Sequence, residues 1–426
     1  MKLLPKENKL SLIAIYSILF FLAVGSLFYG FFGHRLIEAM YKGESIEFLN
    51  KIIVGQARRP LEHYLRTANR LFFYFFSLSA LLIVFIMLFT FVVNYLKARR
   101  NKFLADISLV CLTLLFLFLT LEVIVRTYYF FQGEHKFYML VESFYDSKLG
   151  WKGKQIFGDP ESEKYKIFFI GDSFTHGCVL SEEHMYYTVL ADSLDAEIFA
   201  YGAGGYGTLQ EYLILDKFFD EIKPDLVMLQ VCDNDFVNNS WELESRSFYN
   251  NHLMMRPYLR EGKIEYRFPR SLGNIRVFLC LHSNLFYLSF NRIDRILAIL
   301  AKKGLLHSVE EDISKKELDF VPFKRAVFTT NSIIAKMKQR VGNTPIVAFS
   351  VDNRQPYFKH FRRIFKKNNI EFIEAVPKLI GESEEKGLGL RLEEPSPFAG
   401  HFNGLGNRIC AETLIKAMGD LGLIRK

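Results

Sequence analysis

Two long stretches without a charged residue place the strongest constraint on what this chain can fold into. Residues 10–32 read LSLIAIYSILFFLAVGSLFYGFF, and residues 71–93 read LFFYFFSLSALLIVFIMLFTFVV. As helices rising 1.5 Å per residue, both are long enough to cross the roughly 30 Å hydrocarbon core of a bilayer. A third run, residues 107–125, carries only Glu122. Buried core helices need fewer uncharged residues in a row, and cleaved signal sequences have a shorter apolar region. The sequence therefore predicts three transmembrane helices.

Basic residues indicate the orientation of these helices. Lys2, Lys6 and Lys9 precede the first run, and four more cations lie between residues 97 and 102. Because cations are enriched on the cytoplasmic side, both segments are expected to be cytoplasmic. The chain after about residue 130 then lies outside, which predicts a multi-pass protein of the bacterial inner membrane with a periplasmic C-terminal domain. Residues 34–70 are also basic, although the same orientation makes them extracytoplasmic.

Charge and cysteine usage exclude several other classes of function. The net charge of +8 fits this membrane pattern better than a nucleic-acid partner, because the second half has no long block of Lys and Arg. The cysteines are far apart and show no spacing typical of metal ligands. They are Cys111, Cys178, Cys232, Cys280 and Cys410. We therefore expect no metal site, no cofactor and no obligatory disulfide.

After about residue 160, short apolar runs alternate with amphipathic stretches. Runs rich in Ile, Val and Phe predict strands that are buried on both faces of a parallel sheet. These runs are residues 166–171, 196–202, 225–231, 345–351 and 370–376. The stretches between them have helical spacing, at residues 184–194, 208–222, 318–340 and 357–368. This order predicts a doubly wound, flavodoxin-like α/β domain with about five parallel strands and helices on both faces.

The expected organisation has five parts. They are residues 1–33 (cytoplasmic N-terminus and first span), 34–70 (extracytoplasmic amphipathic segment), 71–131 (second and third spans), 132–160 (linker) and 161–426 (α/β domain). An insert at about 238–319 contains a predicted hairpin, residues 256–269, and an apolar helical stretch, residues 284–304. The insert could cover the site and select the substrate, or it could be a structural flap. Its basic and aromatic content would suit an anionic glycan or a lipid headgroup.

Polar and glycine-rich segments follow the predicted strands. Ser173 lies in GDSFTHG after the first strand, Gly205 in GAGGYG after the second, and Asn234 in CDND after the third. His401 precedes the last predicted helix. Because the carboxyl ends of parallel strands lie at one edge of a sheet, we expect these residues to meet there. A nucleophile, a base and hydrogen-bond donors for an oxyanion are what acyl transfer requires.

These four segments resemble the blocks of the SGNH or GDSL hydrolase superfamily, in the order found in that superfamily. Gly171–Ser173 matches the first block, Gly205 the second, Asn234–Asp235 the third and His401 the fourth. The resemblance covers about residues 161–426. It implies a nucleophilic Ser173 and a base, His401. It also implies an oxyanion hole formed by the backbone N–H groups of Ser173 and Gly205 and by the Asn234 side chain.

The chain departs from the family pattern at two positions. Cys232 stands where the family often has glycine, and Phe398 stands in place of the aspartate three residues before the histidine. That aspartate normally orients the imidazole and stabilises its cation. Its role could pass to Glu393 or Glu394, or to a backbone carbonyl. Otherwise the site is a Ser–His dyad, or it is inactive.

Other interpretations of the same residues are weaker. GAGGYG also matches the G-x-G-x-x-G of dinucleotide-binding folds, but a nicotinamide enzyme would leave Ser173 and His401 unexplained. GDSFT lacks the second glycine of the G-x-S-x-G elbow. Ser173 alone would suit a helix N-cap. His176 could be a second base, although a packing or exposed histidine is the simpler interpretation. Asp172 and Asp235 are expected to hold loops in place.

The sequence as a whole predicts a membrane-anchored, extracytoplasmic serine esterase or O-acyltransferase. Its expected substrate is an ester-linked acyl group, O-acetyl first among them, on a cell-envelope glycan or lipid-linked sugar. A membrane partner could supply the acyl group. Two alternatives stay open: a catalytically inactive SGNH-like factor for glycan binding or assembly, and a lipid esterase.

Overall fold

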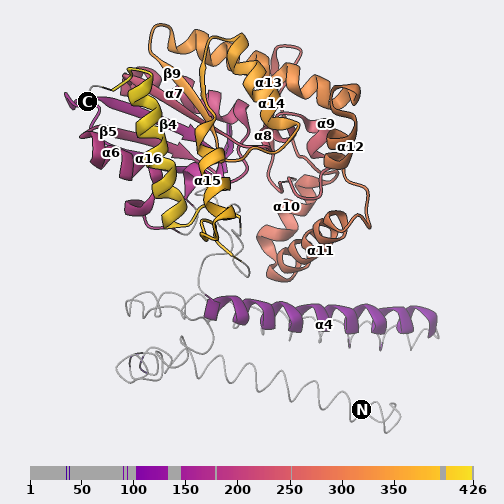
Figure 1. Cartoon of the computed structure of the whole chain (residues 1–426). Helices are drawn as coiled ribbons and strands as arrows, with labels where there is room; N and C mark the ends of the chain where they lie inside the picture. The colour runs from indigo at the N-terminus through magenta and orange to yellow at the C-terminus, as the bar shows by residue number, and fades with distance from the viewer. Residues whose placement is uncertain are drawn as a thin grey trace. The chain divides into compact units, whose positions relative to one another are not determined.

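The computed structural model describes residues 102–132, 145–177, 180–250, 252–393 and 400–424, together with residues 35, 38, 90 and 94 (Figure 1). The chain divides into two compact units. One is Met1–Phe137 with Ser283–Leu288, and the other is Tyr138–His282 with Ser289–Lys426. Apart from single residues, the predicted spans at 10–32 and 71–93 and the segment 34–70 lie outside the described ranges.

In the first unit, the third apolar run forms part of helix α4 (Lys102–Gln132). The helix itself was predicted from the sequence. Among the helices of the described ranges, none combines the length and the apolarity needed to cross a membrane.

Glu122, the one charge in the third apolar run, makes a polar contact inside the first unit. Its buried carboxylate accepts hydrogen bonds from Ser283 Oγ at 2.6 Å and from the backbone N–H groups of Asn284 and Leu285 at 2.8 Å. These N–H groups belong to the first turn of α11 (Asn284–Lys302), where they have no partner within the helix. Glu122 therefore caps α11.

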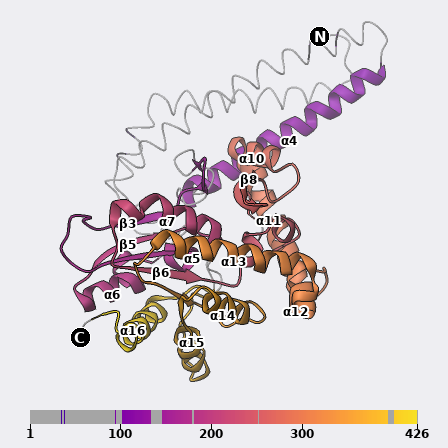
Figure 2. The same ribbon diagram turned by 90° about the horizontal axis from the view of Figure 1, so that it is seen from above.

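The second unit is built on a central sheet, which has six strands in the described part of the chain (Figures 1 and 2). The strands are β3 (Lys154–Phe157), β4 (Lys166–Gly171), β5 (Glu197–Gly202), β6 (Leu226–Val231), β9 (Ile346–Ser350) and β10 (Glu371–Ile373). Their spatial order is β10-β9-β6-β4-β5-β3, and all pairs are parallel except β3 with β5. The five parallel strands have the flavodoxin-like order 2-1-3-4-5, which confirms the predicted fold class.

The predicted linker, residues 132–160, differs from the expectation. Within it, β1 (Tyr145–Asp146) pairs with β2 (Gly150–Trp151), and β3 adds an antiparallel strand at the edge of the sheet. The sequence did not reveal β3, because its KQIF segment is short and mostly half-buried, without the continuous apolar run of the parallel strands. Within the described residues the sheet therefore has the five expected parallel strands and one additional antiparallel edge strand.

Helices cover both faces of the sheet (Figure 2). Three lie on one face: α6 (Tyr186–Leu194), α15 (Ala375–Glu385) and α16 (Gly404–Asp420). On the other face α7 (Thr208–Ile222) packs against α13 (Val321–Val341), and α14 (Tyr357–Lys367) packs beside α13.

Neighbouring residues of β4 point into these two different cores. Phe169 packs against Tyr186 of α6, with ring centroids 5.6 Å apart. Phe168 contacts Phe157 on the opposite face, and Phe157 in turn contacts Phe218 of α7. This alternation is why the strand is apolar throughout.

The insert between β6 and α13 contains the hairpin predicted from the sequence. It is formed by β7 (Arg256–Arg260) and β8 (Lys263–Arg267), which pair antiparallel. The short elements α8 (Asp235–Asn238) and α9 (Trp241–Glu244) precede it. After it come α10 (Gly273–His282), α11, α12 (Val309–Lys316) and the 3-10 turn η3 (Glu317–Asp319). Two further short elements, α5 (Ser173–His176) and the 3-10 turn η2 (Glu182–His184), lie between β4 and α6.

Candidate active site

Ser173 is the first residue of α5, at a sharp turn that follows β4. The preceding residue, Asp172, stabilises this turn through both its side chain and its backbone. Its carboxylate accepts a hydrogen bond from the Phe174 N–H at 3.0 Å, and its own N–H donates to Gln230 Oε1 on β6 at 3.1 Å. Asp172 therefore holds its loop in place, as the sequence predicted.

His401 lies directly beside Ser173, although 228 residues separate them in the chain. Its Nε2 atom is 2.8 Å from Ser173 Oγ, and its ring packs against Phe174 at a centroid distance of 4.7 Å. A serine hydroxyl can donate to an unprotonated Nε2 at this distance. The pair therefore has the geometry required to activate a serine nucleophile.

The residues proposed to orient His401 are only partly described. Glu393 is exposed. Glu394 and Phe398 lie in the segment 394–399, outside the described residues. The loop that carries His401 is held by its backbone, since the N–H of Leu392 donates to the His401 carbonyl oxygen at 2.8 Å.

Gly205 follows β5, the neighbour of β4 in the sheet. Its φ of +75° lies in the left-handed region, which glycine adopts without steric cost. The adjacent carbonyl of Gly204 accepts a hydrogen bond from Trp151 Nε1 at 3.2 Å. The loop therefore depends on β2, from the segment predicted to be a linker.

Asn234 follows β6, the other neighbour of β4. Its Nδ2 atom donates to Asn238 Oδ1 at 2.9 Å and lies 3.5 Å from the carbonyl oxygen of Tyr206. Asn238 in turn donates to the Asn250 carbonyl of the insert at 3.0 Å. These contacts set the direction of the Asn234 amide group.

Asp235 ties the loop after β6 to α7. One carboxylate oxygen accepts from the Cys232 N–H at 2.8 Å, and the other accepts from Thr208 Oγ1 at 3.1 Å. Asp235 is fully buried, and burial raises its pKa above the ordinary range. These contacts confirm the predicted loop-holding position.

His176 occupies a half-buried position close enough to His401 for their charges to interact. Burial, and then electrostatic interactions with Lys154 and His401, lower the pKa of His176 to about 4. The ring is therefore neutral at physiological pH, which fits a packing histidine.

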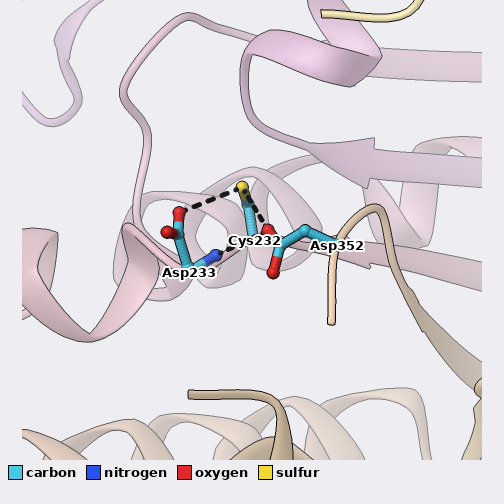
Figure 3. A group of neighbouring side chains, drawn as sticks. All are labelled: Cys232, Asp233 and Asp352. Atoms are coloured by element: carbon cyan, nitrogen blue, oxygen red, sulfur yellow. Dashed lines mark hydrogen bonds between the residues drawn. The ribbon is translucent and has the colours of Figure 1, made fainter. Parts of the chain in front are cut away.

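A small cluster of acidic and thiol groups joins the ends of β6 and β9 (Figure 3). Cys232 Sγ lies 3.1 Å from Asp352 Oδ2 and 3.5 Å from Asp233 Oδ1, and Arg354 binds Asp233 at 2.7 Å. Three possible metal-ligand atoms thus lie within 4.8 Å of one another. However, burial and the two carboxylates raise the pKa of the Cys232 thiol well above its usual value. In this arrangement the thiol contacts Asp352, and Arg354 forms an ion pair with Asp233.

Sequence reasoning missed one group near Gly205. It consists of Trp151 in β2 and of Glu244, His252 and Arg256 in the insert, of which Arg256 is almost fully buried. The available signal was Arg256 at the start of a predicted strand, where a charge that becomes buried needs a partner.

No family model matches this sequence, and no curated protein matches it. Among solved structures, it is similar to an acetyl xylan esterase at 18% identity, covering 59% of this chain and 98% of that one, with a TM-score of 0.31. It is also similar to an acetylxylan esterase from Geobacillus stearothermophilus, at 16% identity, 62% and 98% coverage, and a TM-score of 0.32. A lipase/acylhydrolase from Enterococcus faecalis is similar at 12% identity, 61% and 97% coverage, and a TM-score of 0.33. Likenesses this distant carry no inference about activity.

Proposed function

We propose that this protein is a serine esterase or O-acyltransferase of the SGNH/GDSL type. The observation that carries the proposal is the 2.8 Å contact between His401 Nε2 and Ser173 Oγ. The contact lies at the carboxyl edge of the sheet, where ligands bind in doubly wound folds. Gly205 and Asn234 follow the two strands that flank β4.

The proposed reaction begins when Ser173 Oγ attacks the ester carbonyl carbon while His401 Nε2 takes the hydroxyl proton. The resulting oxyanion accepts hydrogen bonds from the backbone N–H groups of Ser173 and Gly205 and from Asn234 Nδ2. The carbon–oxygen bond to the leaving alcohol then breaks, and His401 returns the proton to that alcohol. Water completes hydrolysis of the acyl-enzyme, whereas a sugar hydroxyl completes transfer.

We further propose that the substrate is an ester-linked acyl group, such as O-acetyl, on a cell-envelope glycan or a lipid-linked sugar. Anchoring of the protein in the bacterial inner membrane supports a surface substrate over a freely diffusing one. The support for anchoring is the two uncharged runs at residues 10–32 and 71–93 and the basic residues that precede the first run. We also propose that the C-terminal domain is periplasmic and that a membrane partner supplies acyl groups.

Fluorophosphonate labelling of the purified full-length protein tests the catalytic part of the proposal. We expect the wild type to be labelled, Ser173→Ala to be unlabelled, and His401→Ala to be labelled at least about 100-fold more slowly. Ser193→Ala is the matched control, because Ser193 is an exposed serine on α6. An unlabelled wild type would favour the inactive glycan-binding alternative, and equal labelling of all variants would exclude Ser173 as the nucleophile.

Localisation needs a separate experiment. A reporter enzyme that is active only outside the cytoplasm is fused after Lys426, and a second reporter that is active only inside is fused at the same position. We expect signal from the first reporter alone. Signal from the second reporter alone would contradict the proposed topology.

A further inference from the structure

A second imidazole faces the loop that carries Gly205. His252 belongs to the insert and lies between α9 and β7. A Cβ atom added to Gly205 would lie 1.7 Å from His252 Nε2 and 2.2 Å from its Cε1 atom. The Nε2 edge of the ring therefore lies directly against the Cα atom of Gly205, one of the two proposed backbone donors to the oxyanion.

The orientation of this ring is set by contacts on its other sides. It stacks on Trp151, with ring centroids 5.5 Å apart and planes 17° from parallel. His252 Nδ1 lies 3.4 Å from Glu244 Oε1, and the His252 backbone N–H donates to the same oxygen at 3.3 Å. Trp151 and Glu244 are both buried, so their contacts restrain the orientation of the His252 ring.

Glu244 determines which nitrogen of His252 carries the hydrogen. Burial acts to raise the pKa of Glu244, but Arg256, His252 and the Tyr258 hydroxyl together hold it below its usual value. Arg256 Nη1 lies 3.1 Å from Glu244 Oε1, and the Tyr258 hydroxyl lies 2.9 Å from Oε2. An ionised carboxylate can only accept, so His252 Nδ1 carries the hydrogen. In the neutral ring, Nε2 then has a lone pair to offer.

The Nε2 atom of His252 makes no hydrogen bond with a residue in the described ranges. The rest of the ring contacts Trp151 and Glu244. The His252 side chain is 21% exposed, so part of it is open to solvent. A hydrogen-bond acceptor that is fixed beside the Gly205 loop and has no partner among the described residues is suited to a polar group of the substrate.

We propose that His252 Nε2 accepts a hydrogen bond from a free hydroxyl of the substrate bound at Gly205. This contact makes His252 a specificity-determining residue that selects esters of polyhydroxylated alcohols, such as partly acylated sugars, over simple esters. The inference rests on the proposed esterase function and narrows its substrate class. A site built to bind a hydroxyl discriminates strongly against substrates that lack it, because its acceptor then stays unpaired.

Two substitutions of His252 separate the proposed contact between Nε2 and the substrate hydroxyl from the contact between Nδ1 and Glu244. His252→Asn keeps a donor for Glu244 but is too short to reach Gly205, whereas His252→Gln can place an amide oxygen near the position of Nε2. His307→Asn is the matched control, since His307 is an exposed histidine of the same insert. The probes are methyl 6-O-acetyl-glucoside, which has free hydroxyls, and p-nitrophenyl acetate, which has none. All assays use the full-length protein.

We expect His252→Asn to lower kcat/KM on the acetylated glucoside by about 10- to 100-fold, mainly through KM. The same variant should change kcat/KM on p-nitrophenyl acetate by less than about threefold, because no hydroxyl contact is lost. His252→Gln should recover part of the loss, and His307→Asn should match the wild type on both probes.

Fluorophosphonate labelling of Ser173 in every variant distinguishes failure of the His252 proposal from failure of the esterase proposal. A labelled wild type, with either no loss in His252→Asn or equal losses on the two probes, would overturn the role of His252 and leave the esterase proposal standing. A wild type that is neither labelled nor active would overturn both. A wild type that hydrolyses only p-nitrophenyl acetate would likewise exclude the proposed sugar specificity.

Discussion

Gly205 combines a conformational constraint and a steric one. Its φ of +75° is strained for any residue with a side chain, and an added Cβ would collide with His252 Nε2. We predict that Gly205→Ala lowers the free energy of unfolding by about 1–3 kcal/mol. It should also slow labelling of Ser173, because the backbone N–H moves. Thermal unfolding and labelling rates measure the two effects.

A matched glycine isolates the steric part of this prediction. Gly262 has a similar φ of +80°, but no atom lies within 4 Å of the position its Cβ would take. Gly262→Ala should therefore show only the strain, about 1 kcal/mol, with normal labelling. Combining Gly205→Ala with His252→Ala should relieve the collision. If Gly205→Ala and Gly262→Ala lose the same stability and activity, His252 does not press on Gly205.

Asp172 should make stability depend on pH. Burial, the largest cause, with the charges of Asp233 and Asp352, raises its pKa from 3.8 to about 7 despite the hydrogen bond from the Phe174 N–H. Between these values the folded protein holds a proton that the unfolded chain has released. Stability therefore falls as pH rises from about 4 to 7, by up to about 1.4 kcal/mol per pH unit.

The Asp172→Asn variant tests this pH dependence, because an amide does not titrate. Its unfolding temperature should fall less than that of the wild type between pH 4.5 and pH 7.5. Identical pH profiles for the two proteins would show that Asp172 titrates normally in the folded state.

At the scale of elements, Glu122 explains how a charge is accommodated in an apolar helix. Its carboxylate provides the acceptor that the first turn of α11 lacks, and Arg126 one turn further along α4 binds it at 2.6 Å. Within the first unit, this polar contact joins α4 to residues Ser283–Leu285.

Glu122→Ala should loosen the start of α11. Loss of a cap costs about 1–2 kcal/mol, so the amide hydrogens of Asn284 and Leu285 should exchange roughly 5- to 30-fold faster. Hydrogen-exchange mass spectrometry of the segment containing both residues measures this. Glu163→Ala, at an exposed position before β4, is the control. Unchanged exchange in Glu122→Ala would mean that the cap does not stabilise this turn.

At the scale of the whole molecule, the second unit contains its own core. This unit consists of residues 138–282 and 289–426. It contains the central sheet, the helices on both faces of the sheet, and the Ser173–His401 pair. We predict that a fragment of residues 138–426 folds cooperatively and keeps Ser173 labelling within about threefold of the full-length rate, because a compact unit with its own core can fold alone. A fragment that unfolds without a cooperative transition would show that the first unit completes the fold.

Much of this organisation could be predicted because it depends on local sequence. Thr208–Ile222 matched its predicted helix, and the hairpin in the insert was expected from its alternating pattern. The edge strand Lys154–Phe157 was missed because it is short and its register is set by β5. The His252 group was missed because Glu244, Arg256 and Trp151 come together only in the folded chain.

The sequence alone determined the order of the five parallel strands and of the helices between them, since apolar periodicity reflects which side chains must leave water. Because parallel strands end at one edge of a sheet, the sequence also predicted that Ser173 and His401 lie close together at that edge. Tertiary structure decided the rest: the 2.8 Å contact between them and the imidazole of His252 against Gly205. Such contacts depend on directions and distances between distant segments, and these arise only when side chains pack in three dimensions.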